Sequence, residues 1–202
     1  MNGVVVGITG VYCSGKSLAA AVFEELGFTQ VDVDRVGHRA LELHSDRVAA
    51  AFGDEVLAGG AVDRRKLGAV VFGDPEKKRE LERIVHPWMI REVRRRVQQP
   101  GDWVINAALL VEMCLFVLCD AVIAVTADRS VLIERAVRRD GISPPEAQRR
   151  LEAQTPVKAK LHLVDIVIEN NGGEDAFRAQ VRETARSLLE ADRGSRGRAH
   201  GR

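Results

Sequence analysis

Residues 10–17 of this chain read Gly-Val-Tyr-Cys-Ser-Gly-Lys-Ser, and they decide how the rest of the sequence is interpreted. The octapeptide matches the phosphate-binding loop pattern of glycine, four residues of any kind, glycine, lysine, and serine or threonine. Glycine lets the backbone approach a triphosphate closely, so that several N–H groups can point at it. The lysine reaches the β- and γ-phosphates, and the final hydroxyl can take one position on Mg²⁺. The octapeptide therefore predicts a nucleoside triphosphate site.

The residues on either side of the loop supply the strand and the helix that this motif requires. Val4–Thr9 is a short apolar run rich in β-branched residues, which is typical of a buried strand. After the loop, Leu18, Val22 and Leu26 recur at helical spacing, and Gly27 is expected to end the helix. The positive end of that helix would face the phosphates. This context separates the motif from a chance match.

We expect the nucleotide to be bound by the loop and by the first turn of the helix. The predicted binding residues are Gly10, Cys13, Ser14, Gly15, Lys16, Ser17 and Leu18. Lys16 is also expected to act on the transferring phosphate, and Ser17 to bind Mg²⁺. Cys13 could be a reactive thiol because it lies near a helix N-terminus, although phosphate binding needs only its backbone N–H.

The remainder of the chain alternates strands with helices, which predicts a mostly parallel sheet with right-handed crossovers and helices on both faces. Further strands are expected at 28–33, 103–107, 121–125 and 165–169. Helices are expected at 34–43, 46–57, 63–72, 75–99, 129–139 and 143–154, with a last one that ends near 189. Pro87 should kink or restart the long charged helix, because proline lacks the N–H that a helix interior needs.

Composition excludes several other classes of protein. The chain has 202 residues, 46% hydrophobic and 29% charged, which is enough to bury a core. A net charge of +1 gives no argument for binding to nucleic acid or to a membrane. The three cysteines fit no metal-ligand spacing and indicate a reducing cytosol. No signal peptide or membrane span is expected, and nothing demands more than a monomer, so we expect a soluble cytoplasmic protein.

Two aspartates are candidates for the reaction itself. Asp32 and Asp34 end the second predicted strand, at the edge of a parallel sheet that faces the ligand crevice. Two positions apart in extended chain, they would point to the same side. A carboxylate there can orient or deprotonate an attacking hydroxyl, or help to hold the waters of Mg²⁺. The alternative is that Asp34 only caps the next helix.

Arginines on a later helix are the second group of candidates. Arg135 and Arg139 are four residues apart and share one helix face, next to a predicted hinge at Gly141. Guanidinium groups on a hinged lid can close on the transferring phosphoryl group and exclude water. The alternative is a solvated helix face.

In this order along the chain, these segments resemble the dephospho-coenzyme A kinase family, over about residues 3–190. Beyond the loop, the resemblance rests on Asp32-Val33-Asp34, Asp63-Arg64, His86-Pro87, Leu109-Leu110-Val111-Glu112, Glu134-Arg135, Arg139-Asp140, Gln154 and Asn170-Asn171-Gly172. The family usually has Gly-Gly-Ile-Gly where this chain has Gly10-Val11-Tyr12-Cys13. A β-branched Val11 disfavours a positive φ, and Tyr12 adds a bulky ring beside the phosphates.

The resemblance implies a fold of the P-loop, nucleoside-monophosphate-kinase-like type. Such a fold is α/β, with a parallel five-stranded sheet flanked by helices, a helical acceptor-binding insertion and a small helical lid. The implied layout is one domain over 1–190, with core segments 1–44, 102–128 and 165–190, an insertion at 45–99, a lid at about 129–160 and a disordered basic tail at 191–202.

The resemblance also implies an activity: transfer of the γ-phosphoryl group of ATP to the ribose 3′-hydroxyl of dephospho-coenzyme A, with Mg²⁺. Asp34 would be the base, and Arg139 with Arg135 would belong to the lid. Asp32, Arg64 and His86 would lie on the acceptor side. The alternatives are a kinase for another acceptor, such as a nucleoside monophosphate, and a nucleotide-binding protein without catalysis. The preference for ATP over GTP is left open.

Overall fold

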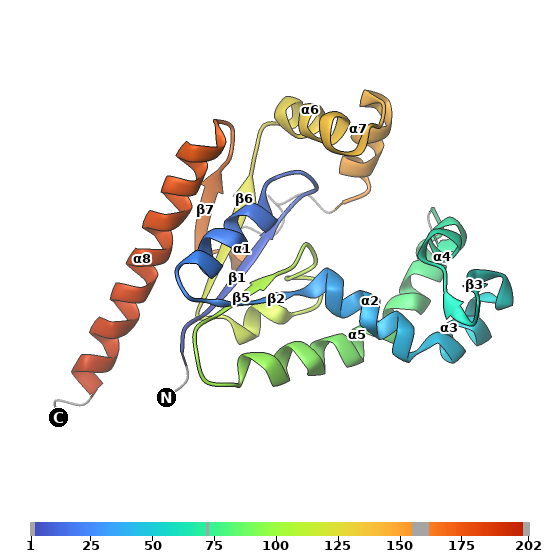
Figure 1. Cartoon of the computed structure of the whole chain (residues 1–202), viewed down its shortest axis with the longest axis horizontal. Helices are drawn as coiled ribbons and strands as arrows, with labels where there is room; N and C mark the ends of the chain where they lie inside the picture. The colour runs from blue at the N-terminus through green and yellow to red at the C-terminus, as the bar shows by residue number, and fades with distance from the viewer. Residues whose placement is uncertain (1–2, 72, 155–161, 200–202) are drawn as a thin grey trace. The chain divides into compact units, whose positions relative to one another are not determined.

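The computed structural model describes residues 3–71, 73–154 and 162–199 (Figure 1). Its main sheet has five strands in the order β2-β5-β1-β6-β7. The strands are β1 (Val5–Gly10), β2 (Thr29–Asp32), β5 (Trp103–Asn106), β6 (Ala121–Thr126) and β7 (Ile166–Glu169). The pairings of β1 with β5, of β1 with β6 and of β6 with β7 are parallel. The strand that leads into the phosphate-binding loop is therefore the centre of the sheet, as the buried apolar run predicts.

Helices α1 (Lys16–Glu25) and α8 (Glu174–Ala199) cover one face of this sheet. Alternate residues of β1, among them Val6 and Ile8, share a buried cluster with apolar residues of both helices. Phe23 of α1 is fully buried in that cluster. In Figure 1, α8 runs beside β7 and α1, the elements that it contacts. This packing fixes α1, and with it the end of the loop, against the sheet.

The opposite face of β1 is covered by the turns that follow β5. A Cβ on Gly7 would lie 2.7 Å from the Cys119 sulfur and 2.9 Å from a Leu110 methyl carbon, so only glycine fits there. Leu115 begins the short 3₁₀ helix η2 (Leu115–Leu118) and is fully buried. These turns run from residue 108 to residue 114, directly before η2.

The chain divides into two compact units, residues 1–31 with 97–202 and residues 32–96. The second unit contains α2 (Val33–Leu43), α3 (Ser45–Phe52), η1 (Asp54–Val56), β3 (Leu57–Ala58), β4 (Ala61–Val62), α4 (Arg64–Val71) and most of α5 (Pro75–Val97). The unit begins at Asp32 and not at the predicted boundary of the insertion, residue 45, because α2 packs on α3 and β4.

Three elements differ from the sequence prediction. Helix α3 ends at Phe52, because Gly53 takes a φ of 88°, and the short η1 takes the place of the rest of the helix expected to residue 57. A small antiparallel hairpin of β3 and β4 then lies between the two predicted helices. Helix α5 continues through Pro87 without a restart. Helix α8 runs to Ala199, so the disordered tail expected from residue 191 is not found over residues 191–199. Within the described ranges, no helix is long and apolar enough to cross a membrane.

Candidate active site

The phosphate-binding loop connects β1 to α1 and takes three positive φ angles. Gly10 has a φ of 155°, Cys13 of 62° and Gly15 of 106°. A Cβ on Gly10 would lie 2.4 Å from the Val125 carbonyl oxygen, and one on Gly15 would lie 2.3 Å from the Asn170 amide nitrogen. Both glycines are therefore required by conformation and by space. Val11 avoids positive φ, and the left-handed position falls on Cys13 instead.

The polar groups of the loop are arranged around the start of α1. The Lys16 ammonium donates to the Val11 carbonyl oxygen at 3.1 Å. Ser17 is exposed in the first turn of the helix. The Ser14 hydroxyl is buried and has no hydrogen-bond partner within the described residues. Cys13 is partly buried, and burial raises the pKa of its thiol, so the expected lowering at a helix N-terminus is not found.

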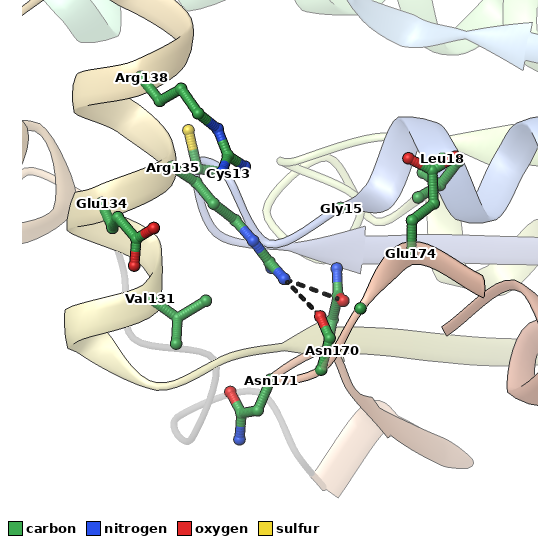
Figure 2. Close-up of a pocket in the computed structure, with 12 residues that line it drawn as sticks. Cys13, Gly15, Leu18, Val131, Glu134, Arg135, Arg138, Asn170, Asn171 and Glu174 are labelled. Carbon is green, nitrogen blue, oxygen red and sulfur yellow. Dashed lines mark hydrogen bonds between the residues drawn. The ribbon is translucent and has the colours of Figure 1, made fainter. Parts of the chain in front are cut away.

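A cavity of about 520 Å³ lies beside the loop (Figure 2). Its walls come from the start of α1, from α6 (Arg129–Asp140) and from the turn between β7 and α8. The lining residues are Cys13, Gly15, Leu18, Val131, Glu134, Arg135, Arg138, Asn170, Asn171, Gly172, Gly173 and Glu174. The cavity adjoins the predicted phosphate site, at the carboxyl ends of parallel strands where open α/β sheets bind ligands.

Asn170 ties the cavity to the loop. Its side chain is almost completely buried, and its amide nitrogen donates to the Ser14 carbonyl oxygen at 2.8 Å. Its amide oxygen accepts from Arg135 at 3.2 Å, and the same guanidinium nitrogen donates to the Gly172 carbonyl oxygen at 3.4 Å. The other terminal nitrogen of Arg135 is buried without a partner among the residues that the structure places. Buried polar groups are normally paired, so this nitrogen is an exception within the cavity wall.

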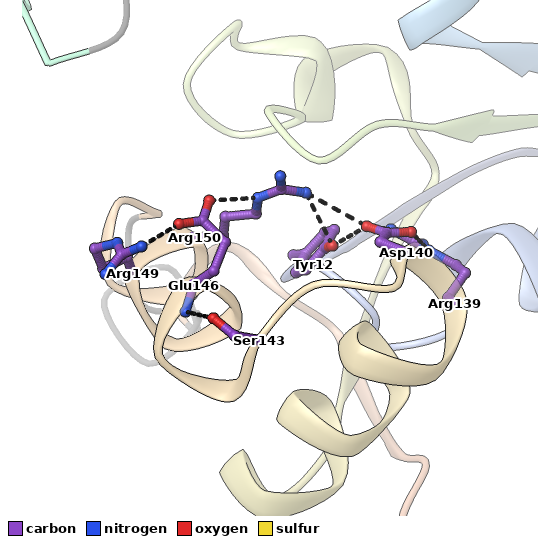
Figure 3. Close-up of polar contacts among 7 residues, drawn as sticks. All are labelled: Tyr12, Arg139, Asp140, Ser143, Glu146, Arg149 and Arg150. Atoms are coloured by element: carbon purple, nitrogen blue, oxygen red, sulfur yellow. Dashed lines mark hydrogen bonds and ion pairs between the residues drawn. The ribbon is translucent and has the colours of Figure 1, made fainter.

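Helices α6 and α7 (Pro144–Glu152) cover most of the segment predicted to be a lid, and they pack against each other. Gly141 ends α6 with a φ of 66°, the left-handed conformation common at helix C-termini, and the hinge at this position stays a prediction. Arg139 and Arg135 lie on α6, but they have different surroundings. Arg135 lines the cavity, whereas Arg139 is bonded to Asp140 and lies over the ring of Tyr12 (Figure 3). The hydrogen bonds that Arg139 donates to the Asp140 carboxylate raise the pKa of its guanidinium, which therefore stays charged.

The two aspartates at the end of β2 are arranged differently from the extended chain that the sequence predicts. Asp32 is the N-cap of α2, and its carboxylate accepts from the backbone N–H of Asp34 at 3.0 Å and of Arg35 at 3.2 Å. Asp34 is exposed in the first helical turn, so the prediction that it caps the helix is wrong. The helix begins one residue after Asp32, and the two carboxylates therefore do not alternate along an extended chain.

The acceptor-side residues lie in the unit 32–96. Arg64 contacts the ring of His38, with 3.2 Å between a terminal guanidinium nitrogen and Nδ1. His86 lies within α5 and is half-buried, and burial lowers its pKa, so it is neutral at pH 7. Asp32, Asp34, Arg64 and His86 belong to this unit, and the loop and lid to the other. Their roles toward an acceptor stay predictions.

Some residues around the loop were not predicted as site residues. Asn170 lines the cavity, and Gln154 accepts the backbone N–H of Tyr12 at 2.7 Å. A signal for Asn170 was present in the sequence, because it follows a strand and precedes a glycine pair at the ligand edge of the sheet. The contact between Tyr12 and Asp140 had no such signal, because the two residues lie far apart in the sequence and no local pattern links them.

A family model and curated relatives that match this chain have the same description. A family model described as dephospho-CoA kinase matches residues 4–176. A dephospho-CoA kinase of Anaeromyxobacter dehalogenans is 41% identical over 203 residues, which cover 96% of this chain and 94% of that protein. One from Shouchella clausii is 36% identical, over 87% of this chain and 94% of the relative.

Solved structures agree with these matches. The protein TT1252 of Thermus thermophilus superposes with a TM-score of 0.79 at 31% identity, over 92% of this chain and 98% of that one. A dephospho-CoA kinase of Campylobacter jejuni, at 21% identity over 93% of this chain and 98% of its own, gives a TM-score of 0.63 and supports the fold. The chain belongs to the dephospho-CoA kinase family.

Proposed function

We propose that this chain transfers the γ-phosphoryl group of ATP to the ribose 3′-hydroxyl of dephospho-coenzyme A. Family membership over residues 4–176 supports this acceptor. The structural observation that carries the proposal is the loop at 10–17, whose glycines are fixed by space and which adjoins a cavity of about 520 Å³. Phosphoryl transfer asks the protein for alignment and positive charge, and little covalent chemistry.

The nucleotide would be held by the loop and the cavity together. The backbone of the loop and Lys16 would hold the phosphates, at the positive end of α1. The cavity between α6 and the turn 170–174 would take the base and ribose. The unpartnered nitrogen of Arg135 supports this placement, because a buried cationic donor is satisfied by an acceptor atom of a ligand.

The residues present also fit a magnesium ion that arrives with the nucleotide. Among the residues that the structure places, no cluster of three His, Cys, Asp or Glu side chains could hold a metal by itself. Mg²⁺ that enters with a nucleotide binds mainly through phosphate oxygens and waters, with one or two protein oxygens. The exposed hydroxyl of Ser17 would be the protein ligand. When bound, the ion would supply charge neutralisation for the phosphates.

Each site residue would have a defined role in the transfer step. The 3′-oxygen of the acceptor would form the new bond to the γ-phosphorus as the bond to the β,γ-bridging oxygen breaks, and ADP would leave. Asp34 would accept the hydroxyl proton. Lys16 and the lid arginines, Arg135 and Arg139, would stabilise the charge on the equatorial oxygens. Asp32, Arg64 and His86 would lie toward the acceptor, with Asp32 acting through the start of α2.

The first test is ADP release by purified protein with ATP, Mg²⁺ and dephospho-coenzyme A, compared with D34N. We expect turnover in the wild type and a loss of about 10²–10⁴-fold in D34N, with ATP binding retained. Equal turnover on AMP or CMP would assign a different acceptor. ATP binding without transfer to any acceptor would make the protein a binder. We expect a monomer in the cytoplasm, which size-exclusion chromatography and cell fractionation would check.

A further inference from the structure

Tyr12 joins the phosphate-binding loop to both lid helices (Figure 3). Its hydroxyl donates to the carboxylate of Asp140, the last residue of α6, and accepts from an Arg150 guanidinium nitrogen of α7 at 3.4 Å. Its backbone N–H donates to the Gln154 side chain at 2.7 Å. One loop residue therefore contacts three positions of the lid segment through two different groups.

The same ring supports Arg139. The central guanidinium carbon of Arg139 lies 4.8 Å from the ring centre of Tyr12, within the range of a cation–π contact. Arg139 also donates to the two carboxylate oxygens of Asp140, at 2.7 and 3.2 Å. The plane of the guanidinium is thus fixed by the carboxylate on one side and by a residue of the loop on the other. A long arginine side chain held in this way loses little freedom when it meets a phosphate.

We propose that Tyr12 is a positioning residue that holds Arg139 of the lid at the phosphate-binding loop. The proposal rests on the proposed function, in which Arg139 acts on the transferring phosphoryl group. The isoleucine usual in the family could neither donate to Asp140 nor accept from Arg150, so this chain couples loop and lid by contacts of its own. Because the coupling orients a group that acts during transfer, it should raise kcat more than it lowers the KM for ATP.

Steady-state kinetics of Y12I and Y12F test this prediction. Y12I removes the cation–π contact with Arg139, and the energy of such a contact corresponds to a fall in kcat of about three- to tenfold. We expect the KM for ATP to stay within about twofold of the wild type. Y12F keeps the ring and should recover most of the loss. R149A is the matched control, because Arg149 pairs with Glu146 on the exposed side of α7 and has no contact with Tyr12.

A double-mutant cycle with R139M shows whether Tyr12 acts through Arg139. If it does, Y12I should have no further effect on kcat in the R139M background. An equal fall in both backgrounds, or a kcat in Y12I that matches or exceeds the wild type, would overturn the proposal. Absence of turnover in the wild type would instead defeat the proposed function.

The contact can also be measured without activity, because Tyr12 is the only tyrosine of the chain. Burial and the hydrogen bond to Asp140 raise the pKa of its phenol, against a lowering by Arg150, with Cys13 raising it further. Ultraviolet absorbance of the tyrosinate should therefore show a single phenol that titrates above pH 10.0, and D140N should move it down. A wild-type phenol with the ordinary pKa would mean that the loop and lid do not meet in solution, and would overturn the proposal.

Discussion

Cys13 adopts a φ of 62°, in the left-handed region, at a position where the family pattern has glycine. A residue with a Cβ loses roughly 1–2 kcal/mol in this region relative to its preferred conformation. Replacing it with glycine removes that cost, but the unfolded chain gains freedom. We expect C13G to raise the free energy of unfolding by about 0.5–1 kcal/mol, measured by urea denaturation.

The control for this prediction is C13A, which removes the sulfur but keeps the Cβ. Because the strain comes from the Cβ and not from the thiol, C13A should show no gain in stability. Equal stability of C13G and C13A would mean that the left-handed conformation costs the protein nothing. The two variants also separate backbone strain from the partly buried thiol of Cys13.

Asn170 and Asn171 offer a second comparison of single residues. Asn170 is 5% exposed and bonds Ser14 and Arg135, whereas the Asn171 side chain lies at the surface and accepts the Asp128 N–H at 2.7 Å. N170A would remove the side-chain donor to the buried Ser14 carbonyl oxygen and one of the two acceptors of Arg135, so we expect a loss of about 2–3 kcal/mol. N171A should cost about 0.5–1 kcal/mol, because water can replace its bond.

Urea denaturation measures both asparagine variants, and calorimetric titration with ATP adds a functional readout. N170A should weaken ATP binding, because Asn170 holds both the loop and Arg135. N171A should bind ATP as the wild type does. A reversed order of the two variants would contradict the role that the structure gives to Asn170.

At the scale of elements, the sequence predicts most strands and helices because their apolar periodicity is clear. β1 and β6 are continuous apolar runs, and α1 ends before the predicted Gly27, which has a φ of 94°. The hairpin of β3 and β4 was missed, because two strands of two residues each carry no periodicity. The sequence predicts that Pro87 kinks or restarts the helix, yet α5 does not restart there, because apolar neighbours such as Val85 and Met89 are buried by packing.

The start of α2 gives a prediction at this scale. Asp32 caps the helix, and the base predicted for the transfer is Asp34 in its first turn. D32A should destabilise the protein by about 1 kcal/mol, because two backbone N–H groups lose their acceptor, and D32S should restore most of that loss. D34N should leave stability within about 0.5 kcal/mol while it removes turnover.

Thermal unfolding and ADP release, both measured on D32A, D32S and D34N, distinguish the role of helix cap from the role of catalytic base. Full turnover in D32S with wild-type stability would show that Asp32 acts only as the N-cap of α2. A loss of stability in D34N equal to that in D32A would show that the helix start was assigned to the wrong residue.

At the scale of the whole molecule, the candidate site draws on distant parts of the sequence. The loop was predicted because its eight residues are contiguous and their chemistry is local. The bond from Asn170 to Ser14 joins positions 156 residues apart, and no local pattern encodes it. The same holds for the second compact unit, which begins at Asp32 because α2 packs on elements beyond the expected boundary.

The dependence of whole-chain stability on pH follows from Glu92 of α5. Hydrogen bonds from Arg95 and Arg96 lower the pKa of Glu92 from 4.5 to about 2, and its side chain is 14% exposed. A lowered pKa stabilises the folded state above pH 4.5, and this stability is lost as the pH falls toward 2. Because Arg95 is exposed, we expect a contribution of about 1–2 kcal/mol, which E92Q should lack at pH 7.

Urea denaturation between pH 7 and pH 3 should therefore show a steeper fall in the free energy of unfolding for the wild type than for E92Q. E76Q is the matched control on the same helix, since Glu76 pairs with Arg79 at 78% exposure and should change little. Parallel curves for the wild type and E92Q would show that the Glu92 pairs do not stabilise the fold.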